Sequence, residues 1–254
     1  MTEKPDPQFL KRGYKTVAFS NREKLGALRK KFVEQFDRLS RFNDLGAIAD
    51  DAGVEALYRN KRRDIWVAVL DQLPFLPDVM RLSGNREAID IVRKHGIREP
   101  AIGGVRPAIL ANMPRDDKFL YAAHQDISFI PGSLNSVSVW IPLQDVPAEI
   151  GPLEVIPGSH LDGLLQHNGE RDVKKSRLIP MPSDSAFVPV PVELGQAIVF
   201  SKFLVHRSGP NRSDAIRFSI QLRFNDLASP EYSRRKHTLD PIDPNSQPQY
   251  GHDA

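Results

Sequence analysis

The chain has 254 residues, 40% of them hydrophobic, and a formal net charge of +3 at pH 7. It has no cysteine, which excludes disulfides, thiolate metal sites and a cysteine nucleophile, so any metal must be held by His, Asp or Glu. Its 35 basic and 32 acidic residues nearly balance, and no apolar run approaches the roughly 20 residues that cross a bilayer. We therefore expect a cytoplasmic protein that binds neither nucleic acid nor membrane.

The first hundred residues predict helices. The segment at 20–39 begins with Ser20 and Glu23 at capping-box spacing. An apolar stripe follows at steps of three and four residues: Leu25, Leu28, Phe32, Phe36 and Leu39. Shorter helices are expected in "DIWVAVLDQL" and "LPDVMRL", and "NREAIDIVRKHG" has Asn85 as a cap and Gly96 as a stop.

From about residue 105, short β-branched or aromatic runs alternate with prolines and glycines. No helical pattern separates these runs, so we expect an antiparallel jelly roll flanked by the N-terminal helices. The prediction is a mainly β single domain at 1–228, helical at 1–100 with the jelly-roll core at 105–228, and a polar, proline-rich tail at 229–254. The expected strands are 105–112, 119–124, 134–141, 153–156, 186–192, 196–201 and 216–224.

His124 and Asp126, in "AAHQDISF", follow the expected strand at 119–124. Side chains two residues apart on a strand share a face, so this imidazole and this carboxylate can reach one ion. A triad of two histidines and one carboxylate needs another imidazole and leaves positions open on the metal. His206 is the best candidate, because it too ends an apolar run, in "FLVHRSGPNRS".

The other histidines are predicted to lie outside the site. His160 and Asp162 repeat the same spacing, but they follow the turn "IPGS", so we expect a surface loop. The remaining histidines stand in polar contexts and are expected to be solvated: His95, His167, His237 and His252.

The stretch "IRFSIQLRF" alternates between apolar and polar residues. One interpretation is a half-buried strand with a wet face. The other concerns Arg217, which follows His206 by eleven residues, beyond a turn. A strand returning from that turn would bring the guanidinium close to the metal, where its planar fork would suit a carboxylate.

Four motifs together resemble the phytanoyl-CoA dioxygenase family of Fe(II)- and 2-oxoglutarate-dependent oxygenases. They are "HQD" at 124–126, "VWIPLQDV" at 139–146, "GPLEVIPGSH" at 151–160 and "HRSGPNRSDAIR" at 206–217. The resemblance covers roughly residues 105–225. The helical first third is similar to the family only in its general character, without matching motifs.

The resemblance implies a double-stranded β-helix with Fe(II) on His124, Asp126 and His206. It implies that Arg217 pairs with the distal carboxylate of 2-oxoglutarate and that Ser208 assists. Two further positions match residues that line the family's cosubstrate or metal pocket: Trp140 and Gln125. The implied reaction consumes O2 and 2-oxoglutarate, releases succinate and CO2, and hydroxylates or otherwise oxidises an unactivated C–H of a small-molecule metabolite.

Two other classes of function stay open at this stage. One is a cupin-like jelly-roll isomerase or hydrolase that does not use 2-oxoglutarate, and the other is a non-catalytic binding or structural protein. The substrate cannot be read from these residues, and a monomer and a homodimer are both compatible with them. The polar loop at 160–185 is a candidate lid, or a solvated excursion.

Overall fold

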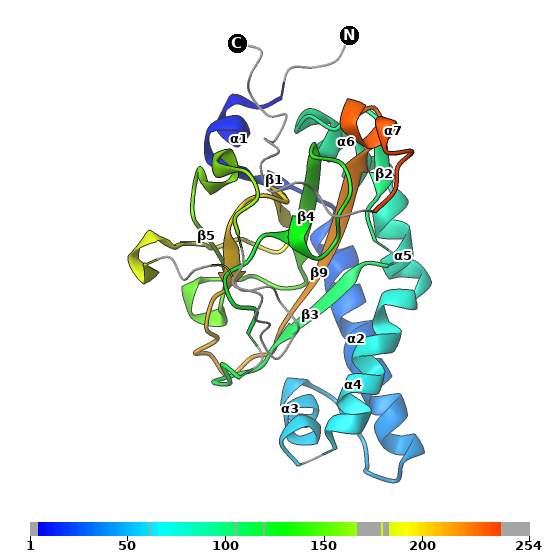
Figure 1. Cartoon of the computed structure of the whole chain (residues 1–254). Coiled ribbons are helices and arrows are strands. Elements are labelled where there is room, and N and C mark those ends of the chain that lie inside the picture. The colour runs from blue at the N-terminus through cyan, green and yellow to red at the C-terminus, as the bar shows by residue number, and fades with distance from the viewer. Residues whose placement is uncertain are drawn as a thin grey trace.

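Two antiparallel sheets form the centre of the protein in the computed structural model, which describes residues 5–60, 62–104, 106–118, 120–166, 179 and 183–239 (Figure 1). The larger sheet has the order β1-β7-β4-β9-β2, with β3 also paired to β9, and the smaller has the order β6-β5-β8. The larger sheet consists of β1 (Tyr14–Ala18), β2 (Pro100–Ile102), β3 (Ala108–Asn112), β4 (Ser136–Pro142), β7 (Gln196–Ser201) and β9 (Arg217–Asp226). The smaller consists of β5 (Leu153–Val155), β6 (Val188–Val190) and β8 (His206–Ser208).

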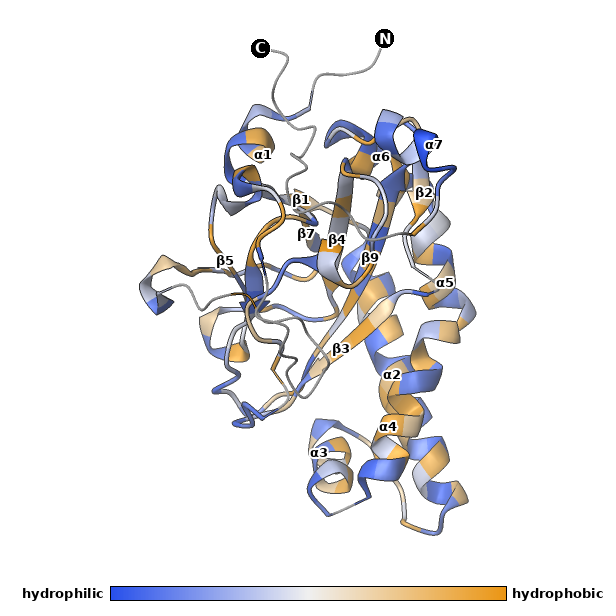
Figure 2. Cartoon of the chain, viewed as in Figure 1, coloured by the Kyte–Doolittle hydropathy of each residue, from blue (hydrophilic) through white to orange (hydrophobic). Residues whose placement is uncertain are grey.

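Helices from the first part of the chain cover one face of the larger sheet (Figure 1). The hydrophobic residues of α2 form a stripe between hydrophilic ones (Figure 2), and this stripe packs against the sheet. The helices are α1 (Pro7–Arg12), α2 (Arg22–Phe42), α3 (Asp51–Arg59), α4 (Arg63–Gln72), α5 (Pro77–Gly84), α6 (Arg86–Lys94) and α7 (Pro230–Arg234). In the described part of the chain, no helix has both the length and the apolar character needed to cross a bilayer.

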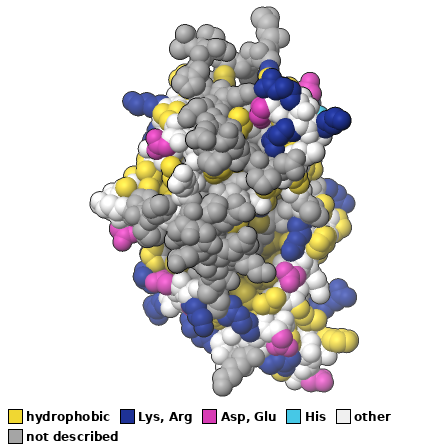
Figure 3. Space-filling model, in the orientation of Figure 1, with side chains coloured by type: hydrophobic (Ala, Val, Ile, Leu, Met, Phe, Trp, Pro, Cys, Tyr) yellow, Lys and Arg dark blue, Asp and Glu magenta, His cyan; other side chains and the backbone are white. Residues whose placement is uncertain are grey.

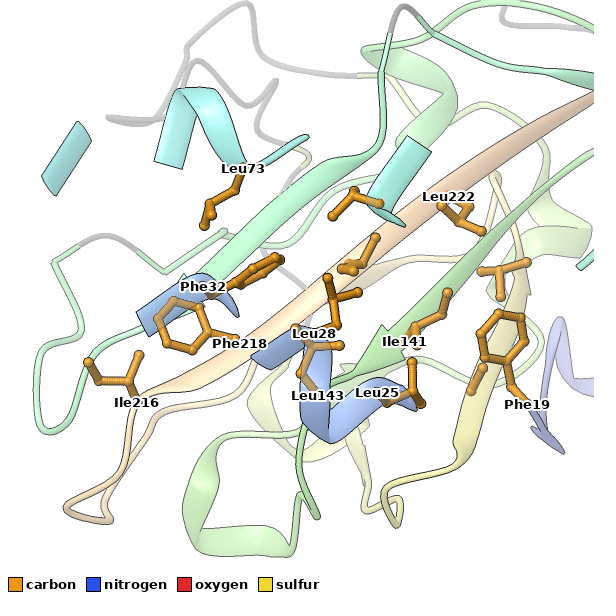
Figure 4. Packing of buried hydrophobic residues seen from close by; sticks show 14 of the residues in the cluster. Phe19, Leu25, Leu28, Phe32, Leu73, Ile141, Leu143, Ile216, Phe218 and Leu222 are labelled. Atoms are coloured by element: carbon orange, nitrogen blue, oxygen red, sulfur yellow. The ribbon is translucent and has the colours of Figure 1, made fainter. Parts of the chain in front are cut away.

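The two faces of the central strands differ in kind because successive side chains of a strand point to opposite sides. The outer face is apolar and packs on the helices: Phe218 of β9 lies against Phe32 of α2, with ring centroids 5.8 Å apart, and Ile141 of β4 belongs to the same cluster (Figure 4). The inner face looks toward the smaller sheet, where Trp140 of β4 packs in a cluster with Leu153 of β5. Buried polar side chains, such as Ser138 and Gln221, lie on this inner face.

The predicted class, mainly β with helical additions, agrees with these elements. The strand expected at 196–201 has the observed bounds of β7, and the alternation expected in "IRFSIQLRF" is the register of β9. The strand expected at 119–124 is wrong: residues 120–123 form no strand, and His124 pairs with His206 only as an isolated bridge. Strands β1, β2 and β8 were not expected.

The helix caps show one correct prediction and one wrong one. The side chain of Asn85 accepts a hydrogen bond from the backbone N–H of Ala88, as expected of the α6 cap. The cap of α2 is Asn21 rather than Ser20: its side chain accepts from the N–H of Glu23, whereas Ser20 has a φ of 58°. Both helices therefore start with an asparagine.

Two histidines that were expected to be exposed are buried. His160 has no exposed surface, and its Nε2 donates to the carbonyl of Leu10 over 2.9 Å, so the predicted surface position is wrong for His160, whereas Asp162 is exposed as expected. His95 is 4% exposed, and its Nδ1 donates to the carbonyl of Ile91 over 2.7 Å. In each ring one nitrogen donates to a backbone carbonyl, which lowers the cost of burial.

Two predicted segments are only partly described. The candidate lid at 160–185 falls largely on residues 167–178 and 180–182, outside the described residues, as does His167. The predicted tail begins with α7, whose Tyr232 is buried, while 240–254, with His252, lie outside the described part. His237 is exposed, as expected.

Candidate metal centre

Two imidazoles and one carboxylate meet between the sheets. His124 and His206 are joined by a reciprocal pair of backbone hydrogen bonds, with N–O distances of 3.0 and 3.1 Å. Asp126 opens a short 3-10 turn, Asp126–Ser128. One ligand atom from each of the three residues lies within 4.8 Å of the other two, and all three residues are buried. Among the described residues, this is the group of His, Asp and Glu side chains that could hold a metal ion.

Backbone contacts set the tautomers of both histidines. Nδ1 of His124 donates to the carbonyl of Ala122 over 2.7 Å, and Nδ1 of His206 donates to the carbonyl of Leu204 over 2.9 Å. Nε2 is therefore the ring atom that each histidine can offer to a metal, and these atoms lie 3.7 Å and 3.8 Å from Oδ1 of Asp126. A backbone carbonyl on the far nitrogen is the usual way to orient a metal-binding imidazole.

The two oxygens of Asp126 have separate partners. Oδ1 faces the histidines, whereas Oδ2 accepts hydrogen bonds from Oγ of Ser138 and from Nε2 of Gln221, the latter over 2.5 Å. Arg223 is also near, with its Nε 3.6 Å from Oδ2. Oδ1 is left free for a metal ion, so the carboxylate is oriented to bind through one oxygen.

Electrostatics favour the metal-binding protonation states. Burial lowers the pKa of His206 to about 4, assisted by repulsion from His124, so the ring is neutral at neutral pH. Burial alone would raise the pKa of Asp126, but Arg223 and the two histidines outweigh it and hold that pKa well below its usual value. Neutral imidazoles and an ionised carboxylate are the forms that bind a divalent cation.

A narrow cavity adjoins the triad. Arg217, Trp140 and Ser208, all predicted site residues, line it together with His124 and His206. The guanidinium of Arg217 lies 5.3 Å from the ring centroid of Trp140, and its buried Nε has no hydrogen-bond partner. Burial lowers the pKa of Arg217 to about 10, which still leaves it charged at neutral pH. A buried, charged and unsatisfied guanidinium is costly unless an anion joins it, so this end of the cavity suits a carboxylate.

The turn between His206 and Arg217 is held by asparagines. Nδ2 of Asn112 donates to the carbonyl of Gly209 over 2.9 Å, and Nδ2 of Asn211 donates back to the carbonyl of Asn112 over 3.1 Å. Gly151 has a φ of 74°, and a Cβ there would lie 2.6 Å from the carbonyl oxygen of Gly209, so only glycine fits. These contacts shape the connection from β8 in the smaller sheet to β9 in the larger one, and Arg217 at the start of β9 lines the cavity.

Gln125 is the predicted site residue that the structure does not bring into the cavity. Its Nε2 donates to the carbonyls of Gly163 and Phe203 over 2.8 and 2.6 Å, and its Oε1 accepts from the N–H of Leu165 over 2.9 Å. Because the turn after His124 points the two neighbours apart, Gln125 faces backbone while Asp126 faces the histidines. Its role is to fasten the segment at 163–165.

Three inner-face residues were not predicted as site residues. Ser138 and Gln221 bind Asp126, and Arg223 lies beside it. The alternation in "IRFSIQLRF" already put Gln221 and Arg223 on the same face as Arg217, so that signal was present in the sequence. The alternation at 136–141 likewise put Ser138 on the same face as Trp140, but its contact with Asp126 depends on tertiary structure, in which β4 lies next to β9 and Ser138 pairs with Arg223.

Fully buried Lys202 lies behind this site. Its Nζ donates to Oδ1 of Asn225 over 2.9 Å, and burial lowers its pKa to about 7. A second and larger hollow lies beside α2 and the segment at 48–51. It is remote from the triad, and the described residues that line it offer no comparable ligand set.

A buried His–Asp–His cluster between two antiparallel sheets defines a jelly-roll protein with a mononuclear metal site. Residues 18–219 match the model of the family described as "Phytanoyl-CoA dioxygenase (PhyH)". The chain belongs to this family of dioxygenases, which confirms the family and the enzyme class predicted from its motifs. The family uses Fe(II), 2-oxoglutarate and O2.

One relative is phytanoyl-CoA dioxygenase domain-containing protein 1 of Danio rerio, 35% identical over 149 residues, which are 53% of this chain and 45% of that protein. The chain thus matches less than half the length of this relative. Among solved structures, the "non-heme alpha ketoglutarate dependent carbocyclase SnoK" aligns with a TM-score of 0.57 and 16% identity, covering 93% of this chain and 91% of that one. The epimerase SnoN, solved with Fe3+ and alpha ketoglutarate, aligns with a TM-score of 0.53 and 18% identity over 96% and 94%. These likenesses confirm the predicted fold.

Proposed function

We propose that this protein is an Fe(II)- and 2-oxoglutarate-dependent dioxygenase that hydroxylates, or otherwise oxidises, an unactivated C–H of a small-molecule metabolite. The observation that carries the proposal is the pairing of two features in one cavity. The ligand atoms of His124, Asp126 and His206 lie within 4.8 Å of one another, and the buried guanidinium of Arg217, with an unpartnered Nε, lines the same space.

The donor set fits Fe(II). Two neutral imidazoles and one carboxylate are the ligands of a facial triad, which leaves three positions of an octahedron open. His124, Asp126 and His206 would hold the ion, and Ser138 and Gln221 would keep Oδ1 of Asp126 directed at it. Bound Fe(II) supplies the activation of O2 that is coupled to oxidative decarboxylation of 2-oxoglutarate to succinate and CO2.

The cavity fits the cosubstrate. Arg217 would receive the distal carboxylate of 2-oxoglutarate in its planar fork, with Ser208 as a further donor beside it. The ring of Trp140 supports the guanidinium from one side. Apolar walls from Leu110 and Leu153 limit the access of water, which strengthens these charge contacts.

The rival function is a jelly-roll isomerase or hydrolase that does not use 2-oxoglutarate. It would need the same triad, but it would not explain why a charged, buried Arg217 lines the cavity without a hydrogen-bond partner for its Nε. An inert binding protein would leave both features unexplained.

The setting of the enzyme is part of the proposal. We infer a single oxygenase domain over residues 1–228 that acts in the cytoplasm as a monomer or homodimer, without nucleic acid or membrane. Two observations support this: the chain lacks cysteine, and the basic side chains on the described part of the face in Figure 3 are interspersed with acidic ones. A nucleic-acid surface would gather one sign of charge instead.

The test is succinate formation from 2-oxoglutarate in the presence of Fe(II) and O2. We expect slow succinate release by the wild-type protein even without substrate, and none from Asp126→Ala. His237→Ala changes an exposed histidine outside the cavity and should keep the wild-type rate. Metal binding without any binding of 2-oxoglutarate would instead support the rival metalloenzyme.

A further inference from the structure

A second arginine, Arg223, lines the same cavity as Arg217, and its only interaction described so far is the Coulombic attraction to Asp126. Its side chain is 14% exposed, and its buried Nε has no hydrogen-bond partner. Among the described residues, no group accepts a hydrogen bond from its guanidinium, and its one ionic contact is Nε to Oδ2 of Asp126 at 3.6 Å. A guanidinium carries five N–H donors, so a cation with open donors faces the cavity.

Asp126 does not require these donors. Oδ2 already accepts hydrogen bonds from Ser138 and Gln221, and a carboxylate oxygen accepts about two. At 3.6 Å, Nε of Arg223 is beyond good hydrogen-bond distance and contributes only a Coulombic attraction. The terminal Nη groups have no partner on Asp126.

The cosubstrate does not require Arg223 either. Arg217 and Arg223 share the inner face of β9 and are six residues apart, which is roughly 20 Å along an extended strand. Gln221, which touches the metal-binding carboxylate, lies between them. A 2-oxoglutarate that joins the metal to Arg217 therefore lies on one side of the centre, and Arg223 lies toward the other.

The charges of the cavity leave room for one more anion. A divalent metal and a dianionic cosubstrate cancel each other, and Asp126 offsets one of the two guanidinium charges, which leaves a net positive charge. A third cavity arginine, Arg207, is already neutralised by Glu154 and Asp184 at 2.6 and 2.5 Å. Buried Lys202 does not line the cavity, and a lysine supplies no negative charge that could pair with Arg223. This net positive charge in a largely buried cavity favours an anionic partner.

We propose that Arg223 binds an anionic group of the substrate, a carboxylate or a phosphonate, and so selects acidic metabolites for oxidation. This inference rests on the proposed function, because the substrate must share the cavity with the metal and 2-oxoglutarate. Arg223 is then a specificity residue, and its fork positions the substrate by its charged end.

The test is equilibrium binding to protein loaded with Mn(II) and 2-oxoglutarate in the absence of O2, measured by calorimetry. Matched probes are butyrate, propylphosphonate and neutral butyramide. We expect at least about tenfold tighter binding of one anion than of butyramide, a typical value for a charge-assisted pair. The preferred anion tells a carboxylate substrate from a phosphonate one.

Variants then locate the anion. Arg223→Gln should abolish the preference for the anion and leave the affinities for Mn(II) and 2-oxoglutarate within a few-fold of wild type, while Arg223→Lys should keep part of the preference. The matched control is Arg207→Gln, in the same cavity, which should keep all of it.

Three results would overturn the inference: no preference for an anion in the wild type, loss of the preference in Arg207→Gln but not in Arg223→Gln, or loss of Mn(II) affinity in Arg223→Gln, which would make Arg223 a support of Asp126. Failure of 2-oxoglutarate to bind the Mn(II)-loaded wild type would be a different result, because it would overturn the proposed function itself.

Discussion

The two faces of β4 and β9 are built from alternate residues of the same strands, yet they are opposites. On the outer face, Phe218 and Ile141 pack against helices in one continuous apolar cluster. On the inner face, Ser138, Gln221 and Arg217 are equally buried but polar. Several inner-face atoms, such as Nε of Arg217 and Oγ of Ser219, have no hydrogen-bond partner.

Alternate residues of the same strands therefore serve stability on one face and function on the other. The outer face supplies the apolar burial that stabilises the fold. The inner face buries polar groups at a cost in stability, which hydrogen bonds such as that from Ser138 to Asp126 offset in part and a bound ion or ligand can offset further. Substitutions on the two faces should therefore change different measured quantities.

The largest effect is expected on the outer face. Phe218→Ala removes a fully buried ring packed on Phe32 and should lower the unfolding free energy by about 3–5 kcal/mol in denaturant titration. Ser219→Ala, the next residue on the opposite face, should change it by less than about 0.5 kcal/mol, because its hydroxyl has no partner. Equal losses in the two variants would remove the distinction between the faces.

A pH-dependent effect should come from Lys202. Its pKa is about 7 in the folded protein and near 10.5 when unperturbed, so between these values the unfolded chain holds a proton that the folded protein has released. Stability therefore rises with pH in this window, by about 1.4 kcal/mol per unit. Relative to Lys202→Met, the wild type should gain about 2–3 kcal/mol from pH 7 to pH 9.

The control for this measurement is Lys24→Met, which changes an exposed lysine and should show the same pH dependence of unfolding as the wild type. A constant difference between wild type and Lys202→Met across the window would mean that Lys202 stays protonated in the folded protein.

Arg217→Met sharpens the contrast between the faces. It removes a buried cation, so the melting temperature should stay level or rise. The affinity of the Mn(II)-loaded protein for 2-oxoglutarate should fall by about 2 kcal/mol or more, the value of a buried charge-assisted pair. Calorimetry and thermal unfolding measure the two quantities separately. A lower melting temperature with unchanged affinity would assign Arg217 to the fold instead of the cosubstrate.

Ser138→Ala should have the smallest effect. It removes one of the two hydrogen bonds to Oδ2 of Asp126 and should weaken Mn(II) binding about tenfold, a typical loss for a group that orients a metal ligand. Ser219→Ala, on the same inner face without a partner, is the matched control and should bind Mn(II) normally. Equal affinities in the two variants would contradict the orienting role.

Prediction from the sequence was most accurate where the pattern of apolar and polar residues or a cap residue is unambiguous. Alternation in "IRFSIQLRF" predicted the two faces of β9, and the cap at Asn85 predicted the start of α6. The strand expected at His124 was wrong, because His124 pairs with His206 only as an isolated bridge and Asp126 opens a 3-10 turn. Local polarity also misled at His95 and His160, which are buried with one ring nitrogen bonded to a backbone carbonyl, that of Ile91 four residues earlier and that of Leu10 far away in the chain.

Contacts made by tertiary structure could not be predicted in this way. The strand β1 pairs with β7, which is far away in the chain, and β8 is only three residues long. The orientation of Gln125 depends on Gly163 and Phe203, which no local rule links to it.

The reciprocal backbone bonds between His124 and His206 place both positions without help from either ring. The spacing of the pair is thus a property of the main chain, and the frame around it can persist through changes of either side chain. The side chain at either position can then be replaced while the backbone geometry that spaces the two positions is kept. A backbone arrangement of this kind allows a different metal-binding or catalytic side chain to be introduced without a change of fold.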